Sequence, residues 1–252
     1  MVPEVVIHDE SKQPEFKEMV DHGAIGVFEN FVKWEFCDSI IDSFEYWYTK
    51  KYLKEECDVK VTTFCGQKLS LSPFSEGQKQ FNDNNLQRKD EQLYLEIADP
   101  CVAMEINQVV GAAFELYTKK YKGILDSSDP VSSWTCKLQK TKSGGGYHTW
   151  HSENGSFLYR DRVLTWMIYL NDIPYENGGG TDFFHQELSL QPKKGTVVLW
   201  PATYTHVHRG AFLTGDITKY IATGWFSREP GDVTNRILSE KSGQVPPRDK
   251  LR

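Results

Sequence analysis

The first 130 residues combine two stretches of helical periodicity with polar segments. Residues 24–28 form a short apolar run that predicts a strand. Apolar residues recur at helical spacing over residues 34–48 and again over about 101–121, where two lysines and a following glycine mark the end of a helix. Residues 51–95 are polar and charged with weak periodicity, so we expect loops there.

From about residue 132 the pattern changes to short strands separated by turn signals. Eight candidate strands follow one another: 134–140, 147–153, 163–170, 180–184, 188–190, 196–200, 206–209 and 219–226. Eight short strands at this spacing predict a sandwich or a jelly-roll barrel. The last residues are polar and contain two adjacent prolines, which predicts an extended arm.

The predicted fold class is therefore α+β, with a double-stranded β-helix (jelly-roll) core and flanking N-terminal helices. We expect residues 1–130 to be a helical and loop support region of the same domain. Residues 131–228 would form the jelly-roll core, and residues 229–252 the C-terminal extended tail.

Composition narrows the class of protein. A chain of 252 residues with 39% hydrophobic and 13% aromatic residues is long and apolar enough for one large domain. The net charge of −6 gives no electrostatic footprint for nucleic acid or an anionic membrane, and no apolar run approaches the length of a membrane span. The N-terminus lacks a signal-peptide pattern, and the five cysteines are scattered. We therefore expect a cytoplasmic protein with free thiols and leave its oligomeric state open.

The sequence His151-Ser-Glu153 is the first candidate for chemistry. On a β-strand these two side chains point to the same face, whereas His148 would point away. A further histidine from a distant strand would place two imidazoles and one carboxylate on one face of a metal. That set leaves coordination positions open and suits non-haem Fe(II) that activates dioxygen.

Two histidines compete for the third position. His206 and His208 share a strand face, and only one is required. The other would then orient a ligand or line the pocket. Alternatively both bind, which would give a three-histidine, one-glutamate site of the cupin type.

Lys219 is the second candidate for chemistry. It lies eleven residues beyond His208 and begins an apolar strand, where a charged residue ordinarily sits at a solvated edge. If Lys219 points into the barrel, burial requires a carboxylate partner, and a small-molecule acid is implied. Such a pair at about 4 Å is worth about 4 kcal/mol at an effective dielectric constant near 20.

The region from about residue 134 to 228 resembles the Fe(II)/2-oxoglutarate-dependent dioxygenase superfamily, and within it the prolyl 4-hydroxylase-like branch. That branch also takes in the lysyl hydroxylase catalytic domain. Order, spacing and residue type agree over six stretches: YHTWHSE (147–153), TWMIYLN (165–171), GGGTDF (178–183), PKKGTVVL (192–199), THVHRG (205–210) and KYIATGW (219–225).

The resemblance implies the roles of the site residues. It places Fe(II) on His151, Glu153 and His208. His208 is preferred to His206 because the related lysyl hydroxylase motif uses its second histidine as the ligand. It places the distal carboxylate of 2-oxoglutarate on Lys219, with the Tyr169 hydroxyl joining that contact. The sequence departs from the family where Glu153 replaces the usual aspartate, and where residues 137–144 offer no match for a second cofactor-contacting tyrosine.

The function implied is hydroxylation of a prolyl or lysyl residue of a peptide or protein, with release of succinate and CO2. The implied cofactors are Fe(II) and 2-oxoglutarate, with ascorbate as a candidate reductant. Two alternatives stay open. One is a hydroxylase of a free amino acid or other small molecule with the same chemistry, and the other is a cupin-like metal-binding protein without oxygenase activity.

Overall fold

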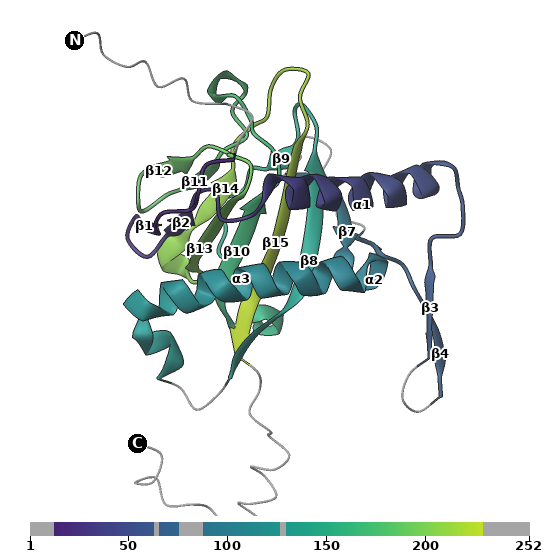
Figure 1. Ribbon diagram of the computed structural model, residues 1–252, viewed down its shortest axis with the longest axis horizontal. Coiled ribbons are helices and arrows are strands. Elements are labelled where there is room, and N and C mark those ends of the chain that lie inside the picture. The colour runs from purple at the N-terminus through teal and green to yellow at the C-terminus, as the bar shows by residue number, and fades with distance from the viewer. Residues whose placement is uncertain (1–12, 63–65, 76–87, 127–129, 229–252) are drawn as a thin grey trace, which may run out of the picture.

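The computed structural model describes residues 13–62, 66–75, 88–126 and 130–228. Within these residues a large antiparallel sheet is covered on one face by helices α1 (Trp34–Tyr52) and α3 (Pro100–Lys120), which cross it side by side (Figure 1). A smaller sheet packs on the other face of the large one. This arrangement puts a helical layer, a large sheet and a small sheet in that order.

The large sheet has eight strands among the described residues. In spatial order they are β1 (Val20–Asp21), β2 (Gly26–Phe28), β13 (Thr196–Pro201), β10 (Arg162–Tyr169), β15 (Lys219–Arg228), β8 (Val131–Thr141), β7 (Glu91–Tyr94) and β5 (Phe74–Ser75). The small sheet has the order β12 (Leu188–Leu190), β11 (Thr181–Phe183), β14 (His208–Gly210). Two further pairs are β3 (Val59–Thr62) with β4 (Lys68–Leu71), and β6 (Arg88–Lys89) with β9 (Gly146–Tyr147).

Short helices complete the structure. They are α2 (Leu95–Ala98) and the single 3₁₀ turns η1 (Lys122–Leu125), η2 (Phe157–Tyr159), η3 (Tyr175–Asn177) and η4 (Tyr204–His206). Helix α3 begins where its sequence says it should: Pro100 occupies the first turn, and the Asp99 carboxylate accepts a hydrogen bond from the Val102 amide at 3.2 Å. In the described part of the chain, no helix is both long and apolar enough to cross a membrane.

Strand alternation gives β10 two different faces. Trp166 and Ile168 pack against the helices, in a core that includes Phe44 of α1 and Ile106 of α3. Tyr169 points the other way and packs with Phe183 of the small sheet. The large sheet therefore has one face committed to the helical core, while its other face is shared between a smaller core and the functional site.

The predicted elements are confirmed in most places. Both long helices form, with ends no more than four residues from the expected ones, and six of the eight expected strands lie where the pattern put them. Residues 51–95 are a correction, because the described part of this segment contains five short strands rather than loops alone. Strand β7 buries Gln92 and Leu93 against β8, so pairing with a neighbouring strand decides a structure that polar composition concealed.

The two expected strands that carry the histidines are also corrected. Of the expected strand 147–153, only Tyr147 belongs to a strand, β9 (Gly146–Tyr147), and His151 forms an isolated bridge. The expected strand 206–209 begins at His208, because residues 204–206 form a 3₁₀ turn. The predicted tail 229–252 lies outside the described residues, as do 63–65 and 76–87 of the segment expected to be loops.

Candidate metal and cofactor site

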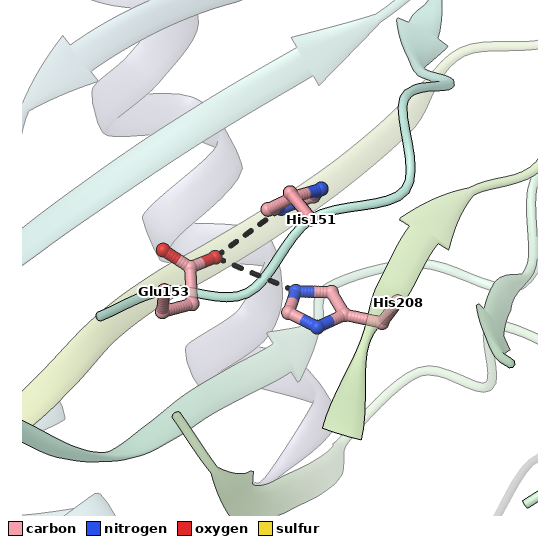
Figure 2. A group of neighbouring side chains, drawn as sticks. All are labelled: His151, Glu153 and His208. Carbon is pink, nitrogen blue, oxygen red and sulfur yellow. Dashed lines mark ion pairs between the residues drawn. The ribbon is translucent and has the colours of Figure 1, made fainter. Parts of the chain in front are cut away.

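Backbone contacts bring His151, Glu153 and His208 together. The backbones of His151 and His208 form an isolated bridge, in which each amide donates to the other's carbonyl at 3.0 Å. The chain then turns, and the Glu153 amide donates to the Ala202 carbonyl at 2.9 Å. Figure 2 shows the result, with the carboxylate reaching toward both imidazoles from the turn. Glu153 Oε1 lies 3.4 Å from Nε2 of each histidine, and the donor atoms of the three residues all lie within 4.8 Å of one another.

The two imidazoles are oriented for metal binding. His151 Nδ1 lies 2.8 Å from the Thr149 carbonyl, and His208 Nδ1 lies 2.9 Å from the His206 carbonyl. A carbonyl oxygen only accepts hydrogen bonds, so each Nδ1 carries the proton and donates. Each Nε2 is therefore the nitrogen directed at the shared centre beside Glu153, where it can act as a metal ligand once it has no proton. Backbone carbonyls that fix the tautomer in this way are usual partners of metal-binding histidines.

Arg162 holds the carboxylate from behind. Its Nη1 donates to Glu153 Oε2 at 3.1 Å and to the Glu153 carbonyl at 3.2 Å. Burial alone would raise the pKa of Glu153, but the contacts with His151 and His208 hold it well below its usual value. The guanidinium itself is sandwiched between the rings of Tyr159 and Trp225, at 3.9 and 3.5 Å from their centroids. One oxygen of Glu153 is thus anchored while the other faces the histidines.

Both ring nitrogens of His206 form hydrogen bonds outside the three-residue cluster. Its Nε2 lies 2.9 Å from the Gly23 carbonyl, so that nitrogen carries the proton, and its Nδ1 accepts from the Thr205 hydroxyl at 2.9 Å. Burial lowers the pKa of His206, which favours this neutral form. Neither ring nitrogen has a lone pair directed toward the other histidines. The structure brings His208 to the cluster and leaves His206 as a link to the N-terminal strands.

His148 points away from the cluster, as strand geometry led us to expect. Its Nδ1 lies 2.9 Å from the Gly210 carbonyl and its ring stacks on Phe212, with 3.6 Å between the centroids.

A cavity of about 380 Å³ connects the three-residue cluster with Lys219. Lys219 is 7% exposed, and its Nζ donates to the Gly179 carbonyl at 2.6 Å. Among the described residues no carboxylate lies within 4.0 Å of this ammonium. Burial lowers the pKa of Lys219 to about 8, although the more distant Asp90 and Asp182 act in the opposite direction. A cation held in this way fits the carboxylate of a small acid that enters the cavity.

The glycines at 178–180 explain how a carbonyl reaches Lys219. Gly178 and Gly179 both have positive φ angles, of 67° and 69°, which residues with a Cβ rarely adopt. The turn that they form leads directly into β11 and presents the Gly179 carbonyl to the ammonium. The glycine run is therefore part of the site's construction.

The comparisons with known proteins agree with this geometry. The model of the 2OG-Fe(II) oxygenase superfamily matches residues 136–227. Over these residues the chain is similar to that superfamily. No curated protein sequence matches the chain.

Solved prolyl hydroxylases share the fold of this chain. A viral collagen prolyl hydroxylase from Paramecium bursaria Chlorella virus-1, in its 2OG complex, has a TM-score of 0.54 at 16% identity over 82% of this chain and 96% of that chain. A Pseudomonas putida prolyl-4-hydroxylase has a TM-score of 0.56 at 13% identity over 82% and 93%. A Trichoplax adhaerens prolyl hydroxylase, in complex with a hypoxia inducible factor peptide, has a TM-score of 0.53 at 16% identity over 86% and 87%. The family match supports the enzyme class expected from the sequence, a 2-oxoglutarate-dependent dioxygenase, and the structural neighbours share the fold of prolyl hydroxylases.

Tyr169 lies beside the Lys219 end of the cavity, behind its wall. The tyrosine is 1% exposed, and its hydroxyl donates to Thr181 Oγ1 at 2.8 Å. The Lys219 ammonium lies 5.7 Å from the tyrosine ring centroid. Thr181, which the sequence did not single out, lines the cavity in front of Tyr169. Direct contact between the Tyr169 hydroxyl and a bound carboxylate therefore stays a prediction.

Residues 137–144, in which the sequence offered no match for a second cofactor-contacting tyrosine, present polar side chains to the cavity. On β8 the side chains of Lys137, Gln139 and Thr141 face the cavity. Tyr147 covers the site from another side, stacked on His151 with 4.0 Å between the ring centroids. The Arg88 guanidinium lies 4.9 Å from the Tyr147 ring, so the described end of the segment 51–95 contributes to the site.

Replacing Arg162 with leucine should weaken Fe(II) binding by about 10- to 100-fold, the usual effect of removing a group that holds a metal ligand. The carboxylate of Glu153 would lose its only described side-chain donor on the outer oxygen. Fe(II) affinity is measured by anaerobic titration. Arg160→Leu is the matched control, because Arg160 is 62% exposed and pairs with Asp161 rather than Glu153. Equal affinity in the two variants would contradict the role given to Arg162.

Proposed function

We propose that the protein hydroxylates a prolyl residue, or alternatively a lysyl residue, of a peptide or protein in a reaction that uses Fe(II) and 2-oxoglutarate. The observation that carries this proposal is the shared cavity: the Nε2 atoms of two histidines and a carboxylate face the same space as a buried ammonium. Among the structural neighbours, one contains 2OG and another contains a peptide of hypoxia inducible factor. Both kinds of ligand are carried over to this chain as part of the proposal.

The chain's own residues would divide the work as follows. His151, Glu153 and His208 would hold Fe(II), and Lys219 with Thr181 would hold the far carboxylate of 2-oxoglutarate. The bound metal and 2-oxoglutarate supply the oxidising chemistry, in which dioxygen is consumed and succinate, CO2 and a hydroxylated product are released. Arg162 would keep the Glu153 carboxylate in place. The small and large sheets, proposed as the two walls of a double-stranded β-helix, would exclude water from the space between them.

Succinate formation tests the proposed chemistry. The full-length protein should convert 2-oxoglutarate to succinate under air with added Fe(II) and ascorbate, and conversion should stop under nitrogen or with a chelator. Candidate peptides with proline or lysine should gain 16 Da in mass spectrometry. Absence of both succinate and an oxoglutarate-dependent thermal shift would overturn the proposal and favour a metal-binding protein without oxygenase activity.

A further inference from the structure

The cavity contains a second lysine far from Lys219. On the paired strands β8 and β15, Lys219 is opposite Thr141, whereas Lys137 is opposite Thr223. The two rows are four residues apart, which corresponds to about 13 Å along the strands. Both lysines line the same cavity. Lys137 therefore belongs to a different part of it, toward Trp225 and the Arg162 side of the metal cluster.

Lys137 is held between aromatic rings. Its ammonium lies 5.0 Å from the ring centroid of Tyr94 and 5.4 Å from that of Trp225. The acidic group that interacts with it electrostatically is Glu96, but Glu96 Oε2 accepts a hydrogen bond from the Cys136 amide at 3.1 Å. Within the described residues no carboxylate approaches the Lys137 ammonium to ion-pair distance, 4.0 Å or less. The charge is thus positioned by aromatic contacts rather than neutralised by an ion pair.

Two polar atoms in the same cavity wall also lack a hydrogen-bond partner among the described residues. Trp225 and Thr165 are opposite each other on β15 and β10, and both line the cavity. The indole Nε1 of Trp225 and the hydroxyl of Thr165 are buried without a hydrogen-bond partner among the described residues. Buried polar groups are nearly always paired, so unpaired ones in a cavity wall point to a ligand that completes them. Arg162, the other cation here, is already engaged by Glu153.

We infer that this end of the cavity binds a carboxylate of the substrate, with Lys137 as its counter-ion. The three groups together offer an ammonium, an indole N–H and a hydroxyl, and a carboxylate accepts from all of these donors. The inference rests on the proposed function and specifies its substrate class. The substrate is one in which the carbon that is hydroxylated lies close to an acidic group. That group is either the side chain of an acidic residue next to the hydroxylated residue of a peptide, or the α-carboxylate of a free amino acid.

The test compares matched substrates. Two peptides that differ only in glutamate or glutamine beside a central proline are assayed for the 16 Da gain, as are free L-proline and L-prolinamide. In at least one pair, the member that bears the carboxylate should be preferred by about 10- to 100-fold in kcat/KM. This is the range expected for a hydrogen bond to a charged group. Preference within the peptide pair identifies an acidic side chain as the source, and preference for proline over its amide identifies the α-carboxylate.

Variants of Lys137 decide whether this lysine causes the preference. Lys137→Met should reduce the preference ratio to near one, Lys137→Arg should keep most of it, and Lys137→Glu should invert it, so that the glutamine peptide or the amide becomes the better substrate. Lys142→Met is the matched control, since Lys142 follows the same strand, is 64% exposed and pairs with Glu91; its ratio should equal that of the unaltered protein. A preference that survives in Lys137→Met, or no preference in the unaltered protein, overturns the inference. Absence of succinate with every substrate overturns the proposed function instead.

Discussion

His208→Ala is expected to lower succinate formation by more than a hundredfold, whereas His206→Ala should leave the dependence on Fe(II) intact. Loss of a group that merely orients a metal ligand already weakens binding or activity by about 10- to 100-fold, and His208 Nε2 faces the proposed iron position directly. His206 has both ring nitrogens occupied by Gly23 and Thr205. Its removal should instead lower the free energy of unfolding by about 1–3 kcal/mol, because the Gly23 carbonyl loses its partner.

The two histidine variants are best measured in parallel. Anaerobic Fe(II) titration reports metal binding, succinate formation reports turnover, and thermal unfolding reports stability. We expect His208→Ala to be impaired in Fe(II) binding and in succinate formation, and His206→Ala to be impaired mainly in thermal stability. Normal iron-dependent turnover in His208→Ala would refute the ligand assignment. Loss of iron binding in a well-folded His206→Ala would revive the three-histidine alternative.

His151, Glu153 and His208 lie together as the sequence predicts, but the local argument that paired His151 with Glu153 holds only in part. It placed His151 and Glu153 on one strand face, but only the His151 backbone is bridged to a neighbouring strand, and Glu153 follows in a turn. The side chains still converge, because the Ala202 carbonyl fixes the turn and Arg162 holds the carboxylate. These partners are distant in sequence and carry no pattern of their own. They could not have been predicted from the spacing of the motif.

Other parts of the site were missed for a related reason. Lys137 lies on a strand that was predicted, yet which of its alternate residues face a cavity depends on pairing with β15. Arg88 lies in a polar segment that becomes ordered by pairing with Tyr147 in β9. By contrast the helices and most strands were predictable, since their apolar periodicity is local. Periodicity locates elements, and long-range pairing decides which polar residues meet.

Lys219→Met is expected to separate cofactor binding from stability. In the protein without 2-oxoglutarate, burial lowers the pKa of Lys219 from 10.5 to about 8, so keeping the charge costs about 3 kcal/mol at neutral pH. Methionine removes that cost and also the hydrogen bond to the Gly179 carbonyl, worth about 1–3 kcal/mol. The two effects roughly cancel. The Tm of the ligand-free variant should therefore stay within a few degrees of the original.

The pH dependence identifies the buried charge. Below pH 8 Lys219 is protonated in both the folded and the unfolded protein, so the destabilisation is constant. Between about pH 8 and 10.5 the folded protein releases this proton while the unfolded protein keeps it, and stability contributed by this residue rises with pH. The Met variant lacks this contribution. The difference in unfolding free energy between the two proteins should thus shift in favour of the lysine protein over that interval, as measured by denaturant titration at several pH values.

Although the Tm of the ligand-free protein should change little in Lys219→Met, the stabilisation by bound 2-oxoglutarate should be lost. At 100 times its dissociation constant a ligand adds about 2.7 kcal/mol to the free energy of unfolding, which is roughly 5–11 °C in Tm for a protein of this size. Measured anaerobically with Fe(II), this shift should be present in the original protein and lost in Lys219→Met, and the KM for 2-oxoglutarate should rise steeply. An unchanged thermal shift in the variant would show that the acid binds elsewhere, and the buried ammonium of Lys219 would then need another partner.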